Sequence, residues 1–256
     1  MSLTSGTGPF GPHPKGHLNF EPPERVVYVE PWPRRVRALT NGSVIVDSER
    51  TVLVYESGRL PRYAFPAEDV SAEAHAEPEP DVEGYVRVPW SAAERWLEED
   101  EEIIVHPHDP YHRIEVLSSS RRVRVRIQGE LVAESTRPRI LFETGLPPRY
   151  YLPQEDVRME ALEPVDMRTG CAYKGWATYW DAVTSGGRVP AAVWSYPESA
   201  PRGRAGPRPP LLLPGAPGDR GRGGRSRAGV VAYRVVRHGL DGGGKSGFVA
   251  EPDTTG

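Results

Sequence analysis

The chain contains one motif twice, and this repeat constrains the fold more than any other feature of the sequence. Residues 143–157 read Glu-Thr-Gly-Leu-Pro-Pro-Arg-Tyr-Tyr-Leu-Pro-Gln-Glu-Asp-Val, and residues 56–70 read Glu-Ser-Gly-Arg-Leu-Pro-Arg-Tyr-Ala-Phe-Pro-Ala-Glu-Asp-Val. The segments align without a gap at an offset of 87 positions (143 minus 56). The identical residues of the first segment are Glu56, Gly58, Pro61, Arg62, Tyr63, Pro66, Glu68, Asp69 and Val70. The sequence therefore predicts two copies of one domain.

Short β-branched runs surround both copies of the motif. Asn41-Gly42 separates two such runs and favours a two-residue hairpin turn, because both central positions of that turn need a positive φ. Val123, Val125 and Ile127 alternate with arginines, a period of two that places the apolar side chains on one face of a strand. The expected strands are residues 35–39, 43–47, 51–55, 103–105, 113–116, 122–127, 130–134, 139–143, 159–162, 175–180 and 189–195, and within the N-terminal segment residues 26–29 resemble a strand.

One short helix is expected after the first copy of the motif. Ser91-Ala-Ala-Glu94 has the spacing of a capping box, and Trp96 and Leu97 follow on what would be one helical face. The expected fold is mainly β, with two tandem domains of short antiparallel strands and irregular ends. The predicted divisions are a Pro/Gly-rich N-terminal segment (1–34), the first repeat domain (35–117), the second repeat domain (121–200), an Arg/Gly/Pro-rich segment (201–229) and a tail (230–256).

Composition narrows the class of protein. A net charge of -3 and a pI near 6.2 supply no basic field, so neither nucleic acid nor an anionic membrane is an expected partner. No apolar run approaches the roughly 20 residues that span a bilayer, and the N-terminus lacks an apolar signal core. We expect a soluble, cytoplasmic protein. Cys171 is the only cysteine, which excludes an internal disulfide and a multi-cysteine metal site.

The repeated corner supplies the first candidate site. An arginine can hold a phosphate or carboxylate bidentately, and paired acids can bind a divalent metal or act as acid and base. The alternative is a fold-defining corner in which the arginine pairs with the acids. The candidates are Arg149 and Tyr150 for ligand binding and Glu155 and Asp156 for catalysis, with Arg62, Tyr63, Glu68 and Asp69 as their equivalents in the first repeat.

Three further groups of residues each have a functional and a structural interpretation. Lys174 could favour the thiolate of Cys171 or contact a phosphate. No histidine lies near Cys171 in the sequence to act as its base, and this favours a buried structural cysteine. His106, His108, Asp109 and His112 offer nitrogen and oxygen ligands for a metal, but the default interpretation is a surface turn between strands. Trp176 and Trp194 belong to an aromatic set that could stack on a planar ligand or form core. The remaining members of that set are Tyr179, Trp180 and Tyr196.

The motif also carries a family resemblance. Together with Cys171-Ala-Tyr-Lys-Gly175, Tyr179-Trp180 and Ala192-Val-Trp-Ser-Tyr-Pro197, it resembles the domain-of-unknown-function family 427 over residues 35–200. The resemblance implies a β-rich domain of the β-tent type and, through a name used for the family, a remote nucleotidyltransferase relation. The family usually has Cys-Pro-Tyr-Lys-Gly, so Ala172 departs from it. The first repeat has Pro107-His-Asp-Pro-Tyr-His112 there, so chemistry that needs Cys171 or Lys174 is expected only in the second.

The C-terminal end departs further from the family. Its members continue into a final strand with an aromatic-Tyr-Gln-Glu-Arg-like run, and the Arg/Gly/Pro-rich composition after about Pro201 is typical of G/C-rich DNA read out of frame. We hypothesise a frameshifted tail, which would leave the second domain without its last strand and with an exposed edge.

Two functions remain open from the sequence. The first is a tandem β-domain protein that binds a small molecule or a protein partner. The second is a metal-dependent enzyme of the nucleotidyltransferase type, in which Glu155 and Asp156 hold a divalent metal while Arg149 and Lys174 hold phosphates.

Overall fold

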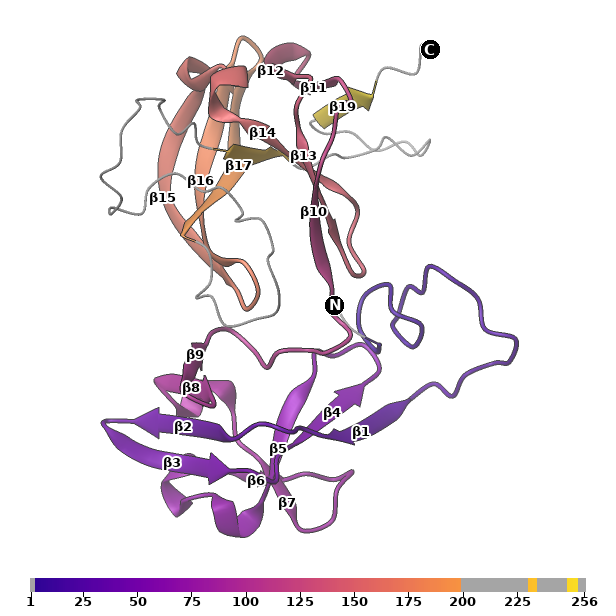
Figure 1. The fold of residues 1–256 in the computed structure, drawn as a ribbon, viewed down its shortest axis with the longest axis vertical. Coiled ribbons are helices and arrows are strands. Elements are labelled where there is room, and N and C mark those ends of the chain that lie inside the picture. The colour runs from indigo at the N-terminus through magenta and orange to yellow at the C-terminus, as the bar shows by residue number, and fades with distance from the viewer. Residues whose placement is uncertain (1–2, 199–229, 234–247, 253–256) are drawn as a thin grey trace. The chain divides into compact units, whose positions relative to one another are not determined.

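The computed structural model describes residues 3–198, 230–233 and 248–252 (Figure 1). The described chain is mainly β, its sheets are small and antiparallel, and its helices are all shorter than seven residues. This confirms the predicted fold class. None of the described helices is long and apolar enough to cross a membrane. The described residues form two compact units. The first is made of residues 3–113, 144–146 and 171–173, and the second of residues 114–143, 147–170, 174–198, 230–233 and 248–252.

The first unit contains two sheets, in the strand orders β1-β4-β5-β7-β6 and β3-β2-β8-β9. Asn41 and Gly42 have φ angles of 48° and 76° between β2 and β3, which confirms the predicted hairpin turn. Its strands are β1 (Val27–Pro31), β2 (Val36–Thr40), β3 (Ser43–Ser48), β4 (Val52–Glu56), β5 (Arg62–Pro66), β6 (Glu77–Pro78), β7 (Tyr85–Arg87), β8 (Arg95–Glu98) and β9 (Glu101–Ile103). Its 3-10 turns are η1 (Ala67–Asp69), η2 (Ala72–Ala74) and η3 (Trp90–Ala92).

The prediction of a helix that begins at Ser91 and includes Trp96 and Leu97 is wrong. Only the 3-10 turn η3 forms there, and Trp96 and Leu97 lie in strand β8, which pairs with β2. The buried Trp96 ring stacks on Trp90 at 4.8 Å. Sheet hydrogen bonds and this aromatic packing outweigh the local capping signal, because one turn of helix has little stability of its own.

The second unit also contains two sheets, in the orders β10-β13-β14-β18-β17-β16-β15 and β12-β11-β19. Its strands are β10 (Ile114–Ser118), β11 (Val123–Ile127), β12 (Glu130–Ser135), β13 (Arg139–Glu143), β14 (Arg149–Pro153), β15 (Leu162–Cys171), β16 (Gly175–Thr184), β17 (Gly187–Glu198), β18 (Val230–Tyr233) and β19 (Phe248–Pro252). Its 3-10 turns are η4 (Gln154–Asp156) and η5 (Met159–Ala161). Val125, Val132, Leu152 and Val193 are among the buried residues of its main core.

The first halves of the two units contain strands and turns in the same order and of the same lengths. Strand β1 begins at Val27 and β10 begins at Ile114, a shift of 87 positions (114 minus 27), and the same shift relates the bounds of every element from β1 to η2 to those from β10 to η5. The isolated bridge between Val46 and Val70 recurs between Ala133 and Val157. The offset found in the motif therefore extends to backbone pairing.

Strands β18 and β19, near the C-terminus, occupy the positions in the second unit that β7 and β8 occupy in the first. Strand β7 pairs with β5, and β18 pairs with β14 in the equivalent place. Likewise β8 pairs with β2, and β19 pairs with β11. The edge that a frameshifted tail would leave open is therefore covered in the structure. Residues 201–229, on which that hypothesis depends, lie outside the described residues.

Candidate functional site

The corner acids of both repeats are held by an arginine that the sequence did not single out. Arg137 Nη2 lies 2.8 Å from Glu155 Oε1 and 3.0 Å from Asp156 Oδ1. In the first unit, Arg50 contacts Glu68 at 2.9 Å and Asp69 at 2.6 Å. Burial alone would raise the pKa of Asp156, but hydrogen bonds from Arg137 and Ser135 outweigh it and leave the pKa lowered. The arrangement closes a structural corner in each unit.

This corner gives a pH-dependent contribution to stability. A carboxyl whose pKa is lower in the folded than in the unfolded chain stabilises the fold above its ordinary pKa, and the contribution disappears as the pH falls through the folded pKa. For Asp156, whose ordinary pKa is 3.8, we expect the contribution to be constant at neutral pH and to be lost below that value. Urea unfolding across a pH series checks this, and Arg137→Gln should reduce the loss of stability at acid pH. An unchanged acid slope in that variant would contradict the assignment.

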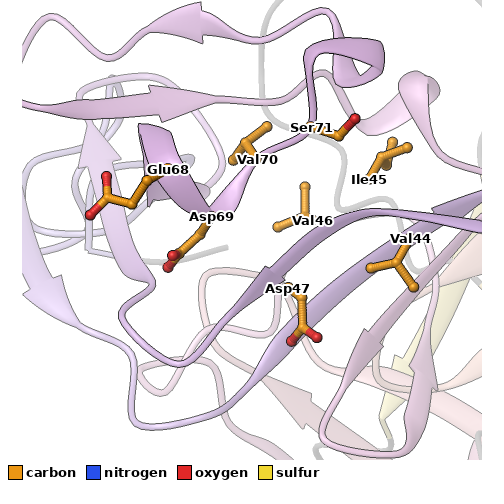
Figure 2. A pocket seen from close by; sticks show the side chains of 8 residues that line it. All are labelled: Val44, Ile45, Val46, Asp47, Glu68, Asp69, Val70 and Ser71. Atoms are coloured by element: carbon orange, nitrogen blue, oxygen red, sulfur yellow. The ribbon is translucent and has the colours of Figure 1, made fainter.

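A shallow pocket lies beside the same corner in the first unit (Figure 2). It measures about 350 Å³ and lies between residues 44–47 of β3 and residues 68–71. The carboxylates of Asp47, Glu68 and Asp69 point in different directions in Figure 2, so they do not converge on one point. Arg35 already contacts Asp47 at 2.6 Å. The pocket therefore offers no set of carboxylates free to hold a metal.

The three histidines pack around Tyr173. His112 stacks on its ring with centroids 4.2 Å apart, and His108 meets it edge-on at 5.3 Å. His108 Nε2 donates to the Ala172 carbonyl at 2.9 Å, and His106 Nδ1 lies 2.7 Å from the Pro107 carbonyl. Burial lowers the pKa of His106. Within the described part of the chain, no group of three or more His, Cys, Asp or Glu side chains is arranged to hold a metal ion.

Cys171 is a half-buried free thiol. His108 Nε2 donates to the carbonyl of the neighbouring Ala172, and His112 stacks on Tyr173. These contacts involve the backbone and the ring beside Cys171, and neither is a contact with its thiol.

The second unit brings several candidates together on one sheet face. Arg149 pairs directly with Leu141 across β14 and β13, so both side chains lie on the face that also carries Tyr151. The Arg149 guanidinium lies 5.6 Å from the ring centre of Trp194 on β17. We call this surface the Arg149 face; its residues are Leu141, Glu143, Arg149, Tyr151, Lys174, Trp194 and Tyr196.

Lys174 is buried on the Arg149 face by an ion pair. Its Nζ lies 2.6 Å from both carboxylate oxygens of Glu143, and it lies 5.9 Å from the ring centre of Tyr196. Both charged side chains are at most 10% exposed. Glu143 was not a sequence candidate. Two sequence features could have indicated this ion pair: the motif opens with a glutamate in both repeats, and a lysine at the position of Lys174 occurs in the second repeat only.

The equivalent arginines of the two repeats have different partners. Arg62 contacts Glu79 through two nitrogens at 2.8 and 2.7 Å and Glu56 at 2.9 Å, and these carboxylates raise the pKa of its guanidinium. In the second unit Lys174 takes the glutamate equivalent to Glu56. No carboxylate in the described residues contacts Arg149, which is half-buried against Trp194. Among the described residues, Arg149 thus has an aromatic neighbour but no carboxylate partner.

The remaining candidates lie elsewhere. Tyr150 and Tyr63 lie next in sequence to the arginines, so alternation sends them to the opposite face, where Tyr150 packs against the main core of its unit and Tyr63 belongs to the core of the first. Trp176 is 42% exposed with Arg168 5.8 Å from its ring centre. Trp180 packs against the main core. Of the candidates for ligand binding in the second unit, the structure brings Arg149, Lys174, Trp194 and Tyr196 together on one face.

Comparison with known proteins agrees with the motif. No curated protein matches this sequence. The family model described as "Domain of unknown function (DUF427)" matches residues 28–83 and 115–205, which together form more than half of the chain. The two matched segments begin within β1 and β10, the corresponding first strands of the two units. The chain therefore belongs to the DUF427 family.

Proposed function

We propose that the protein binds a small anionic molecule with a planar part on the Arg149 face, and that its two units are copies of one domain of which the second carries this function. The observation behind the proposal is the difference between Arg62 and Arg149. Three carboxylates neutralise Arg62, whereas no described carboxylate contacts Arg149. A half-buried guanidinium without a counter-ion is an anion-binding group, because a hydrogen bond to an ionised partner contributes about 1.5–3 kcal/mol.

The aromatic neighbours support a planar ligand. The Arg149 guanidinium carbon lies 5.6 Å from the ring centre of Trp194, and Tyr151 and Tyr196 belong to the same face. A carboxylate or phosphate paired with Arg149 would place an attached ring beside these side chains, where stacking contributes about 1–3 kcal/mol per base in comparable sites. On the same face, Lys174 contacts both carboxylate oxygens of Glu143, and no contact joins Glu143 to Arg149 among the described residues.

The alternative of metal-dependent nucleotidyl transfer has less support. Glu155 and Asp156 would have to leave Arg137 before they could hold a metal. The cytoplasmic location and the absence of nucleic-acid and membrane partners stay predictions from the sequence.

Thermal unfolding of the full chain in the presence of AMP, benzoate or inorganic phosphate tests the proposal. We expect AMP or benzoate to raise Tm more than phosphate does, because both add a planar group to the anion. A ligand at 100 times its Kd adds about 2.7 kcal/mol to the free energy of unfolding. Arg149→Gln should remove the shift. The matched control is Arg121→Gln, which removes the same charge from an exposed position of the second unit and should leave the shift unchanged.

The result is decisive in both directions. If none of the three anions raises Tm, or if the shift survives in Arg149→Gln, the Arg149 face is not an anion site. If Arg121→Gln lowers the shift as much as Arg149→Gln does, the effect is one of net charge and the proposal fails.

A further inference from the structure

A second cluster, in the first unit, combines tyrosines with acids. Tyr28 and Glu30 alternate on strand β1, so both side chains lie on the same face. Tyr55 on β4 is the direct cross-strand partner of Tyr28. Asp109 and Tyr111 come from the loop between β9 and β10 and complete the cluster. We call these five residues the tyrosine cluster.

The hydroxyl groups of the tyrosine cluster converge on Glu30. Tyr55 donates to Glu30 Oε1 at 2.9 Å, while Tyr111 and Tyr28 donate to Oε2 at 2.9 and 3.2 Å. The Tyr55 ring lies 5.7 Å from the Tyr28 ring and 5.8 Å from the Tyr111 ring, the latter edge to face. The two outer rings, Tyr28 and Tyr111, are 41% and 40% exposed. A ligand can therefore reach the cluster past two aromatic rings.

The acids of the cluster lack a cation. Asp109 is 5% exposed, and its Oδ1 accepts from the Tyr111 amide at 2.9 Å and lies 3.4 Å from the Tyr55 hydroxyl. Its Oδ2 is buried and has no hydrogen-bond partner in the described residues. No described Arg, Lys or His side chain contacts Glu30 or Asp109. The other buried acids of this unit, Glu79 and Glu98, are paired with Arg62 and Arg34.

The electrostatic environment agrees with this geometry. Burial, followed by the charge of Asp109, raises the pKa of Tyr55. Hydrogen bonds to Tyr28 and Glu30 raise the pKa of Tyr111. Both shifts mean that a further negative charge is disfavoured here, and a negative field of this kind favours a positively charged ligand.

The fold itself does not require the cluster. The positions 87 residues later, on the matching strands β10 and β13, hold Glu115, Leu117 and Phe142 in place of Tyr28, Glu30 and Tyr55. Their backbone register is the same, because Glu115 pairs with Phe142 as Tyr28 pairs with Tyr55. The second unit thus pairs the same strands with a glutamate, a leucine and a phenylalanine at these positions, so the strand pairing does not depend on the two tyrosines or on Glu30.

We propose that the tyrosine cluster binds a small organic cation of the alkylammonium class. An ammonium ion is attracted to the faces of Tyr28 and Tyr111, and Glu30 lies between them as its counter-ion. Asp109 adds negative potential from behind Tyr55. A metal ion fits less well, because the cluster has only two carboxyl groups, and its other side-chain oxygens are phenol hydroxyls. This site lies in the first unit and is independent of the anion proposed for the second.

Isothermal titration calorimetry of the full chain with choline tests this proposal. We expect choline to bind and its neutral analogue 3,3-dimethylbutan-1-ol to bind at least tenfold more weakly. Glu30→Gln should weaken choline binding by roughly ten- to a hundredfold, the equivalent of one charge-assisted contact. Tyr111→Leu, at an exposed position, should weaken it by about threefold to thirtyfold. Glu101→Gln removes one exposed acid from the same unit and should have no effect.

Several outcomes would overturn the proposal. Choline could fail to bind, the neutral analogue could bind equally well, or Glu30→Gln and Glu101→Gln could have equal effects. Displacement of choline by stoichiometric Mg²⁺ or Ca²⁺ would show a metal site instead. Far-ultraviolet circular dichroism of each variant verifies that it is folded, and Tyr111→Leu serves as the second test if Glu30→Gln does not fold.

Discussion

Replacing Lys174 by methionine is expected to lower the free energy of unfolding by about 3–5 kcal/mol, the cost of removing one partner of a buried ion pair. Lys174 contacts both oxygens of Glu143 at 2.6 Å, and the Glu143 side chain is only 4% exposed. Without the ammonium group, that carboxylate loses the cation that contacts both of its oxygens, in an environment that water hardly reaches. Urea unfolding monitored by tryptophan fluorescence measures the difference.

A double variant separates the charge from the packing. Lys174→Met combined with Glu143→Leu removes both charges, and the pair of apolar side chains should recover most of the lost stability. The control in the first unit is Arg59→Ala. Arg59 is 64% exposed and lies 3.5 Å from Glu56, so its loss should cost less than about 1 kcal/mol. If Lys174→Met costs no more than Arg59→Ala, the Lys174–Glu143 pair does not stabilise the Arg149 face.

Local sequence signals predicted the elements that depend on a few neighbouring residues. The Asn41-Gly42 turn and the mainly β fold follow from residue types and spacing. The helix after Ser91 failed because Trp96 finds its partners, Tyr63 and Phe65, far away in the sequence. Strands β18 and β19 were missed for a related reason. Their pairing partners, β14 and β11, are more than 70 residues earlier, and no local pattern indicates such a pairing.

The sequence allowed us to predict which residues form the candidate site, but not which side chains contact one another. Arg149, Lys174 and Trp194 were singled out by residue type, and the sheet order places them on one face. The sequence suggested that Arg149 would pair with Glu155 and Asp156, because these acids follow it within the motif. Instead Arg137 reaches them, since the turn η4 carries the acids back toward the start of β13. Side-chain partners depend on which strands become neighbours, and that is a property of the whole sheet.

Arg62→Gln is expected to destabilise the protein by about 3–5 kcal/mol, whereas Arg149→Gln at the equivalent position is expected to cost less than about 1 kcal/mol. Arg62 holds the fully buried Glu79 side chain through two contacts at 2.8 and 2.7 Å. Glutamine is neutral and cannot supply the charge, so Glu79 would stay buried without its cation. Arg149 has no such partner among the described residues, so its removal leaves no carboxylate unpaired.

The comparison of the two variants tests the assignment of roles to the two repeats. Urea unfolding gives both free energies, and the same variants can be titrated with AMP or benzoate under native conditions. We expect opposite patterns: Arg62→Gln loses stability and keeps anion binding, while Arg149→Gln keeps stability and loses anion binding. Equal destabilisation would show that Arg149 is a structural residue like Arg62. Loss of binding in both variants would show that the anion site needs the first unit as well. Because the two arginines occupy matching positions at the start of β5 and β14, such a difference would arise from the side chains that surround each of them.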